Sequence, residues 1–238
     1  MNTLHTALVA AALCMAVPAH ADTPWTFAND TRYLAMGDSL TSGYGAMPMT
    51  NGYAYLLYEE GAFGALSNTI FANIAIPGAT SAQVLAHQVP AAAASGMQPN
   101  VITMTVGGND LFTILDRGAD PATVLANFQG NLLAIVHLLC RTQPQARIYV
   151  ANLYAIRDFP VPVEPVIEAF NQVVSGVVAF HASAPYCYGR VKVADVYAEF
   201  TGPQGGLLLV GRNGASFVEA HPSNAGHRAI ARAFAAAR

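Results

Sequence analysis

The fold of this chain is decided first by Arg32-Tyr33-Leu34-Ala35-Met36-Gly37-Asp38-Ser39-Leu40. The first five of these residues are mostly apolar and predict a buried strand over 32–36. Gly37 ends that strand, and Ser39 follows with an aspartate beside it. Open α/β sheets bind ligands at the carboxyl ends of their strands, so Ser39 is expected where such a sheet places a ligand. A serine hydroxyl is a weak nucleophile until a base takes its proton.

Strands and helices alternate along the remaining chain. Strands are predicted over 69–76, 101–106, 147–153 and 191–194, and helices over 53–63, 82–94, 121–140, 162–181 and from Pro222 or Ser223 to near the end. Ser81 is the expected N-cap of the helix over 82–94. Such alternation predicts a parallel sheet with helices on both faces. We therefore expect one three-layer α/β/α domain with a five-stranded sheet.

The first 21 residues predict a secretory signal peptide. Residues 7–17 are all small or apolar, and Ala19-His20-Ala21 follows as an A-x-A cleavage site. The beginning of the chain carries no Lys or Arg, which is atypical for such a peptide. Cleavage near Ala21 would leave residues 22–238 as a single domain. The mature protein is expected to be exported, either to a periplasm or to the medium.

The composition excludes several classes of protein. The chain is 53% hydrophobic and only 11% charged, which argues against disorder. No later run is expected to span a membrane, and no stable membrane anchor is expected. The formal net charge is −3 and no basic cluster exists, so nucleic-acid binding has no electrostatic support. Nothing in the sequence indicates the oligomeric state.

Two cysteines remain after the signal peptide, Cys140 and Cys187. An even pair in an exported protein favours a disulfide, while two buried free thiols are the alternative. The C-x-x-C motif is absent, so neither a redox motif nor a zinc ribbon is supported. The motifs of zinc proteases, P-loops and dinucleotide-binding folds are absent as well, and we expect no metal and no cofactor.

Polar groups follow three of the predicted strands. Ser39 follows the first, Gly78 the second and Asn109 the third, and the carboxyl ends of parallel strands share one edge of a sheet. Acyl transfer needs donors aimed at the oxygen that becomes negative. The backbone N–H groups of Ser39 and Gly78 and the side-chain amide of Asn109 are suitable donors. The alternatives are a helix-entry turn for Gly78 and a helix cap for Asn109.

His221 is the candidate base. It stands directly before Pro222, and a residue before proline favours extended backbone over helix. The imidazole is therefore expected in a loop at the entry to the last helix, near the same sheet edge. The alternative for a single histidine is a structural role.

Together these motifs resemble the four sequence blocks of the GDSL, or SGNH, hydrolases. The blocks are Gly37-Asp38-Ser39-Leu40, Gly78 followed by Ala-Thr-Ser, Gly108-Asn109-Asp110 and His221-Pro222, in the family's order. The resemblance implies a flavodoxin-like α/β/α fold and cleavage of small-molecule or lipid esters. It also implies Ser39 as nucleophile, His221 as base, and Ser39, Gly78 and Asn109 as the oxyanion hole.

The chain departs from the family pattern at one position. The family usually has Asp three residues before the catalytic histidine, and here that residue is Val218. Either Glu219 reaches the imidazole from a shifted position, or a backbone carbonyl such as that of Val218 accepts the Nδ1 proton. Three functions stay open: a carboxylic ester hydrolase or lipase, a carbohydrate O-acetylesterase, and a catalytically silent binding module.

Overall fold

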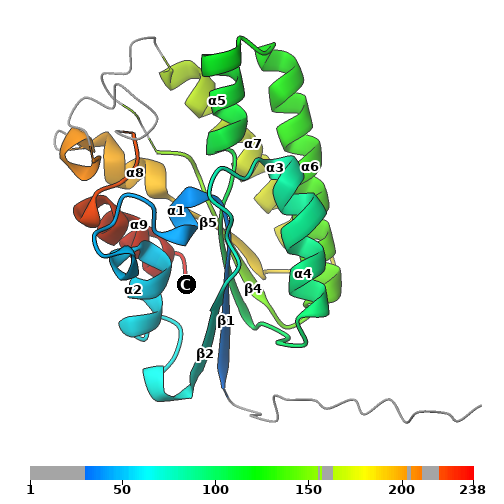
Figure 1. Ribbon diagram of the computed structural model, residues 1–238. Coiled ribbons are helices and arrows are strands. Elements are labelled where there is room, and N and C mark those ends of the chain that lie inside the picture. The colour runs from blue at the N-terminus through cyan, green and yellow to red at the C-terminus, as the bar shows by residue number, and fades with distance from the viewer. Residues whose placement is uncertain (1–29, 155, 157–162, 203–204, 211–219) are drawn as a thin grey trace, which may run out of the picture.

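A computed structural model describes residues 30–154, 156, 163–202, 205–210 and 220–238. The predicted signal peptide, residues 1–21, lies outside them. Five parallel strands form one sheet in the order β2-β1-β3-β4-β5 (Figure 1). The strands are β1 (Thr31–Gly37), β2 (Thr69–Asn73), β3 (Val101–Thr105), β4 (Arg147–Ala151) and β5 (Val191–Ala194). The predicted α/β class with a flavodoxin-like five-stranded sheet is confirmed, because this strand order is the flavodoxin order.

Helices cover both faces of the sheet (Figure 1). One face carries α2 (Tyr53–Glu59), α8 (Val196–Thr201) and α9 (Asn224–Ala236), and the other carries α4 (Val89–Ala94), α6 (Pro121–Thr142) and α7 (Glu164–Ser183). The remaining described elements are α1 (Ser39–Ser42), α3 (Ser81–Gln83), a π-helix (Val84–Gln88) and α5 (Gly108–Arg117), with 3-10 turns at Met49–Asn51, Leu66–Asn68 and Gly205–Leu208.

Some predicted boundaries were wrong. The expected helix over 82–94 is three consecutive helical segments, and its N-cap is Thr80 in a capping box with Gln83, while Ser81 is the first helical residue. Among the described residues, three helices were missed: the short α1, and α5 and α8. Gly107 takes a positive φ of 110° as the cap from which α5 starts.

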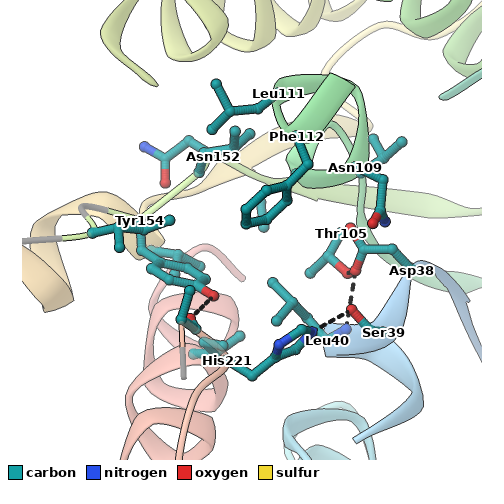
Figure 2. A pocket seen from close by; sticks show the side chains of 18 residues that line it. Asp38, Ser39, Leu40, Thr105, Asn109, Leu111, Phe112, Asn152, Tyr154 and His221 are labelled. Atoms are coloured by element: carbon teal, nitrogen blue, oxygen red, sulfur yellow. Dashed lines mark hydrogen bonds between the residues drawn. The ribbon is translucent and has the colours of Figure 1, made fainter. Parts of the chain in front are cut away.

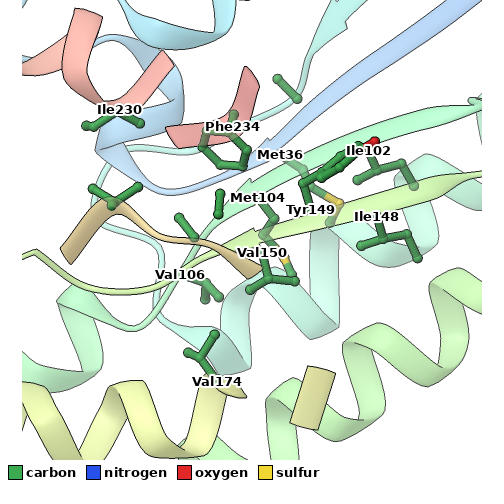
Figure 3. Close-up of a cluster of buried hydrophobic side chains, with 14 of the residues drawn as sticks. Met36, Ile102, Met104, Val106, Ile148, Tyr149, Val150, Val174, Ile230 and Phe234 are labelled. Atoms are coloured by element: carbon green, nitrogen blue, oxygen red, sulfur yellow. The ribbon is translucent and has the colours of Figure 1, made fainter. Parts of the chain in front are cut away.

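The two faces of the sheet bury apolar side chains against their helices. Met104 and Val150 lie in the sheet, Ile230 and Phe234 reach it from α9, and Val174 reaches it from α7 (Figure 3). All five of these side chains are fully buried. The core therefore fixes the sheet between the two helical layers and leaves the strand ends to carry polar groups.

The predicted disulfide between Cys140 and Cys187 is present, with Cα atoms 5.5 Å apart. Cys140 lies near the end of α6, and Cys187 follows α7. Beside the bridge, the guanidinium of Arg190 donates hydrogen bonds to the carbonyls of Cys140, Gln143, Ala146 and Tyr186. Both features join α6 and α7 to the beginnings of β4 and β5, at the amino edge of the sheet.

Helix α6 is long and apolar enough to cross a membrane by length and composition alone, so the expectation that no such run exists was wrong in those terms. Its residues Phe128, Leu132, Ile135, Val136 and Leu139 are buried in the core of the domain. A core helix passes the same test, so length and composition are weak evidence for a membrane span.

A side chain completes the end of β1. The amide of Gln88 accepts a hydrogen bond from Gly37 N and donates one to Gly37 O, both at 2.7 Å. A glutamine amide has the same donor and acceptor as a peptide group. Gln88 therefore pairs with β1 as one residue of a neighbouring strand would.

Buried His227 connects α9 to the chain after β1. Its Nε2 donates to the carbonyl of Tyr44 at 2.9 Å, and its Nδ1 accepts from the backbone N–H of Tyr53 at 3.3 Å. Burial lowers the pKa of His227 to about 4, against the hydrogen bond to Tyr44, which favours the charged form. The imidazole is therefore neutral in the folded protein at ordinary pH and holds both ends of the segment 44–53.

We predict that, with His227 replaced by Gln, the free energy of unfolding falls less steeply than in wild type as the pH is lowered from 7 to 4. The unfolded imidazole takes up its proton near pH 6.5, whereas the folded one does so near pH 4. Between these values the unfolded state binds more protons, so stability falls as the pH is lowered. Between pH 7 and pH 4, the free energy of unfolding of wild type should fall by about 3 kcal/mol more than that of His227→Gln.

Urea unfolding at pH 7, 5.5 and 4 measures this difference. Gln keeps one acceptor and one donor, and all other titrating groups are common to both proteins, so they cancel in the comparison. Parallel stability curves for the two proteins would contradict a neutral His227.

Candidate active site

Ser39 begins α1 directly after β1. Asp38 is the N-cap of this short helix, and its Oδ1 accepts hydrogen bonds from Leu40 N at 3.0 Å and from Thr105 Oγ1 at 2.7 Å. Thr105 is the last residue of β3, so the carboxylate joins the ends of two adjacent strands. Asp38 thereby fixes the turn that presents Ser39, which agrees with a bracing role.

His221 lies within hydrogen-bond distance of Ser39, with Nε2 2.9 Å from Ser39 Oγ. Both residues are buried. Three contacts position the imidazole: its own carbonyl accepts from Val210 N at 2.7 Å, the preceding carbonyl of Ala220 accepts from Tyr154 Oη at 2.6 Å, and the Tyr44 ring lies 4.5 Å from the His221 ring. The structure thus brings together two residues 182 positions apart in the chain.

For Nε2 to accept the serine proton, the neutral His221 must carry its own proton on Nδ1. The two candidates for orienting it, the Val218 carbonyl and the Glu219 carboxylate, lie outside the residues that the structure describes.

The two further candidate donors lie on neighbouring loops. Asn109 is near the start of α5, and its Nδ2 donates to the carbonyl of Ala79 at 2.9 Å. Gly78 takes φ +81° in the turn closed by Ala79 N and Ile76 O, a backbone conformation that favours glycine. No atom lies within 4 Å of the position that a Cβ on Gly78 would occupy, so the surroundings of Gly78 are open.

A buried pair holds these two loops together. Asp110 accepts from Ser81 N at 2.8 Å and from Ser81 Oγ at 2.6 Å. Asn131 of α6 donates to the same hydroxyl. Because Asp110 is adjacent to Asn109 and Ser81 lies three residues after Gly78, the pair fixes the distance between the two candidate donors.

Both aspartates in the motifs titrate abnormally. Burial raises the pKa of Asp38 to about 7, and the hydrogen bonds from Thr105 and Leu40 only partly oppose it. Burial likewise raises the pKa of Asp110, against the two bonds from Ser81. The hydrogen bonds of each carboxyl group go to the loops that carry the motifs: those of Asp38 to Leu40 and Thr105, and those of Asp110 to Ser81.

Ser39 and His221 open into a cavity of about 650 Å³, part of it open to solvent (Figure 2). Most of the groups around it are apolar, and they come from α1, α5, α8, α9 and the chain after β4. The lining includes Leu40, Val106, Leu111, Phe112, Leu153, Tyr154, Ile156, Val196, Ala220 and Ile230. We refer to this space as the apolar cavity.

A second, more polar cleft of about 940 Å³ adjoins the apolar cavity at Asn109 and Phe112. We call it the polar cleft, and its other lining residues are Gly78, Thr80, Gln83, Thr113, Asp116 and Arg117. The predicted site residues are therefore divided: Ser39, Asn109 and His221 line the apolar cavity, whereas Gly78 lines the polar cleft, which also reaches Asn109.

Sequence reasoning missed Tyr154, Phe112 and Tyr44. Tyr154 comes shortly after β4, and a polar side chain beyond a fourth strand end was a usable signal. Phe112 lies one turn into a helix that was not predicted. Tyr44 gave no signal, because its contact with His221 joins segments far apart in the chain.

Within the described part of the chain, no cluster of three or more His, Cys, Asp or Glu side chains is arranged to hold a metal ion. The groups present suit nucleophilic chemistry at a serine. Ser39 and His221 make the nucleophile–base contact that such chemistry requires.

Comparisons with solved structures find the same fold. The chain resembles the lipase Lip_vut3 from a goat rumen metagenome, with 24% identity, a TM-score of 0.65, and coverage of 87% of this chain and 96% of the other. It also resembles Axe2, an acetylxylan esterase from Geobacillus stearothermophilus, with 21% identity, a TM-score of 0.64, and coverage of 86% and 92%. At these identities the likeness shows the fold alone. No curated protein sequence matches at a significant level.

The family model of the GDSL-like lipases and acylhydrolases matches residues 35–229, which include all four sequence blocks and both sides of the apolar cavity. The chain belongs to the GDSL-like lipase/acylhydrolase family and is a hydrolase of ester bonds.

Proposed function

We propose that this protein is an exported serine hydrolase that cleaves carboxylic esters through an acyl-enzyme on Ser39, with His221 as the base. The observation that carries the proposal is the 2.9 Å contact between Ser39 Oγ and His221 Nε2, two residues that line the apolar cavity. Family membership supplies the reaction class, and this contact supplies the mechanism.

In the acylation step, Ser39 Oγ bonds to the ester carbonyl carbon while its proton passes to His221 Nε2. The carbonyl oxygen becomes negative and is stabilised by donors from Ser39 N, Gly78 N and Asn109 Nδ2. The tetrahedral intermediate then loses the alcohol, whose oxygen takes the proton from His221. Water repeats the sequence, with its proton going to His221, and releases the carboxylic acid and free Ser39.

The lining of the apolar cavity supports an acyl group of several carbons as the part of the substrate bound there. Burying such a chain against Leu111, Val196 and Ile230 is favourable by about 0.8 kcal/mol for each CH₂ group. A second candidate substrate is an acetyl ester of carbohydrate. The polar cleft beside Asn109 favours it, because hydroxyl-rich groups need polar partners.

For the orientation of His221 we propose a backbone carbonyl, that of Val218, in place of a carboxylate. The absence of Asp at position 218 supports this assignment. A carbonyl accepts the Nδ1 proton and fixes the tautomer, but its dipole stabilises the imidazolium less than a full charge would.

Export rests on the signal-peptide pattern in residues 1–21, with residues 22–238 as the mature domain, and is supported by the disulfide, since such bridges persist in oxidising compartments. A silent binding module is the rival from another class. It would not require the serine–histidine contact.

The first prediction tests the nucleophile. A serine-directed phosphonate should add its mass to Ser39, and Ser39→Ala should lose most activity on p-nitrophenyl esters. Asn109→Ala should lower kcat by about 10²–10³, the usual effect of removing one oxyanion donor. Near wild-type turnover by Ser39→Ala, with the fold checked by circular dichroism, would contradict the proposed function.

The second prediction concerns the acyl group. Across p-nitrophenyl esters from acetate to palmitate, kcat/KM should peak above acetate. Val196→Phe places a larger ring on the cavity wall and should lower the octanoate-to-acetate ratio of kcat/KM at least tenfold. The activity of the variant on p-nitrophenyl acetate serves as the internal control for folding. A series that peaks at acetate and is insensitive to Val196→Phe would favour the carbohydrate acetylesterase.

The third prediction concerns the orienter of His221. If the Val218 carbonyl holds Nδ1, then Glu219→Gln, which removes only the charge, should cost less than about tenfold in kcat. If Glu219 is the acid of a triad, the loss should approach the ~10⁴ seen when a triad carboxylate becomes an amide. The converse substitution, Val218→Asp, introduces the carboxylate that the family usually has. It should leave kcat unchanged or raise it, provided that the new side chain can turn toward His221.

A further inference from the structure

An exposed apolar rim lies beside the catalytic pair. It consists of Tyr44, Met47, Met49 and Val210, and the exposed fractions of Met47 and Met49 are 79% and 54%. Tyr44 contacts the His221 ring, and Val210 donates to the His221 carbonyl. Two members of the apolar rim therefore touch His221, so the rim lies next to the catalytic pair.

The backbone that carries Met47 is held firmly. Met47 N donates to Asn224 Oδ1 at 2.7 Å, and Met47 O accepts from Asn224 Nδ2 at 2.8 Å and from Asn51 Nδ2 at 2.9 Å. Nearby, the Tyr44 carbonyl is held by buried His227. A Cβ on Gly45 would come within 2.3 Å of the Pro222 carbonyl, which shows how closely this loop packs on the start of α9.

A loop fixed in this way keeps its methionines in water, where they gain nothing from burial. Large exposed apolar side chains gathered in one place mark an interaction surface. Scattered single ones would need no explanation. Because the apolar rim lies next to His221, we connect this surface with the arrival of the substrate.

Charge decides what the apolar rim fits. Residues 39–58 contain no Asp, Glu, Lys, Arg or His, and neither do residues 205–210. These two segments therefore offer no charged partner to an anionic membrane or a charged peptide, both of which are recognised by basic or acidic side chains. They match an apolar phase that is itself uncharged.

We propose that the apolar rim docks the enzyme onto the surface of aggregated, uncharged esters, such as an emulsion of acylglycerols, and so presents the catalytic pair to that surface. This inference rests on the proposed ester hydrolysis at Ser39. It adds that the protein recognises the aggregate with residues outside the catalytic machinery, and that Met47 and Met49 are the side chains that enter it.

The test compares Met47→Ser/Met49→Ser with a matched control, Phe180→Ser/Tyr188→Ser. The control side chains are 59% and 77% exposed, but they precede β5 and lie toward the amino edge of the sheet, away from Ser39. Rates are measured on dissolved p-nitrophenyl acetate and on emulsified tributyrin. The rim variant should lose at least tenfold on the emulsion, with less than twofold change on the dissolved ester, and the control should match wild type on both.

Flotation with an emulsion of a non-hydrolysable trialkylglycerol ether measures docking without turnover. Wild type, Ser39→Ala and the control should float with the emulsion, and the rim variant should remain in solution. Because this readout needs no hydrolysis, failure of docking and failure of the proposed function are seen separately.

Equal flotation of the rim variant and wild type would overturn the inference. So would absence of wild-type flotation, or flotation that requires added anionic lipid. Gel filtration tests the alternative that the apolar rim binds a second copy of this chain. A wild-type dimer that becomes monomeric in the rim variant would show that the rim is a self-association surface.

Discussion

The whole site depends on the close approach of two backbones where β1 and β3 end. Gly37 pairs with Thr105 in register, and a Cβ on Gly37 would lie only 2.0 Å from the Thr105 carbonyl oxygen. Its φ of +126° is also a conformation that side chains with a Cβ rarely adopt. Any other residue would push the two strands apart. Because Ser39 follows one strand and Asn109 the other, this contact sets the distance between the nucleophile and a candidate oxyanion donor.

Buried hydrogen bonds then make the arrangement rigid. Thr41 Oγ1 donates to the Met36 carbonyl and lies 2.7 Å from Thr105 Oγ1, which in turn donates to Asp38. The network contains groups of α1, β1 and β3, so the nucleophile turn cannot shift without breaking several bonds in a medium of low dielectric constant. Preorganised donors stabilise developing charge because they need no rearrangement during the reaction. A raised pKa at Asp38 is the cost of burying a carboxylate for this purpose.

How much the sequence could predict depended on the range of each interaction. The alternation of strands and helices and the candidates Ser39, Gly78, Asn109 and His221 came from local patterns and from four short blocks, whereas the flavodoxin-like sheet was implied by the family resemblance. Although a polar side chain after β4 was a usable signal, the contact of Tyr154 escaped because its bond to the Ala220 carbonyl joins residues 66 apart, which no local pattern encodes. Gln88 escaped for the same reason, since it acts as a strand residue from within a helix. The orienter of His221 remains a prediction, because 218 and 219 lie outside the described residues.

The disulfide and Arg190 stand at the end of the sheet opposite to the site and hold the beginnings of the strands that lead toward it. Strand β4 starts beside them at Arg147 and ends just before the segment that carries Asn152 and Tyr154. Five residues of strand span about 16 Å, so a change of angle at the start of β4 becomes a displacement at its far end. A tilt of about 4° at its base moves the far end by about 1 Å, and a misplacement of that size can cost about 10²-fold in rate. The covalent bridge beside the start of β4 thus restrains the strand that leads to Tyr154, the tyrosine that binds the histidine loop.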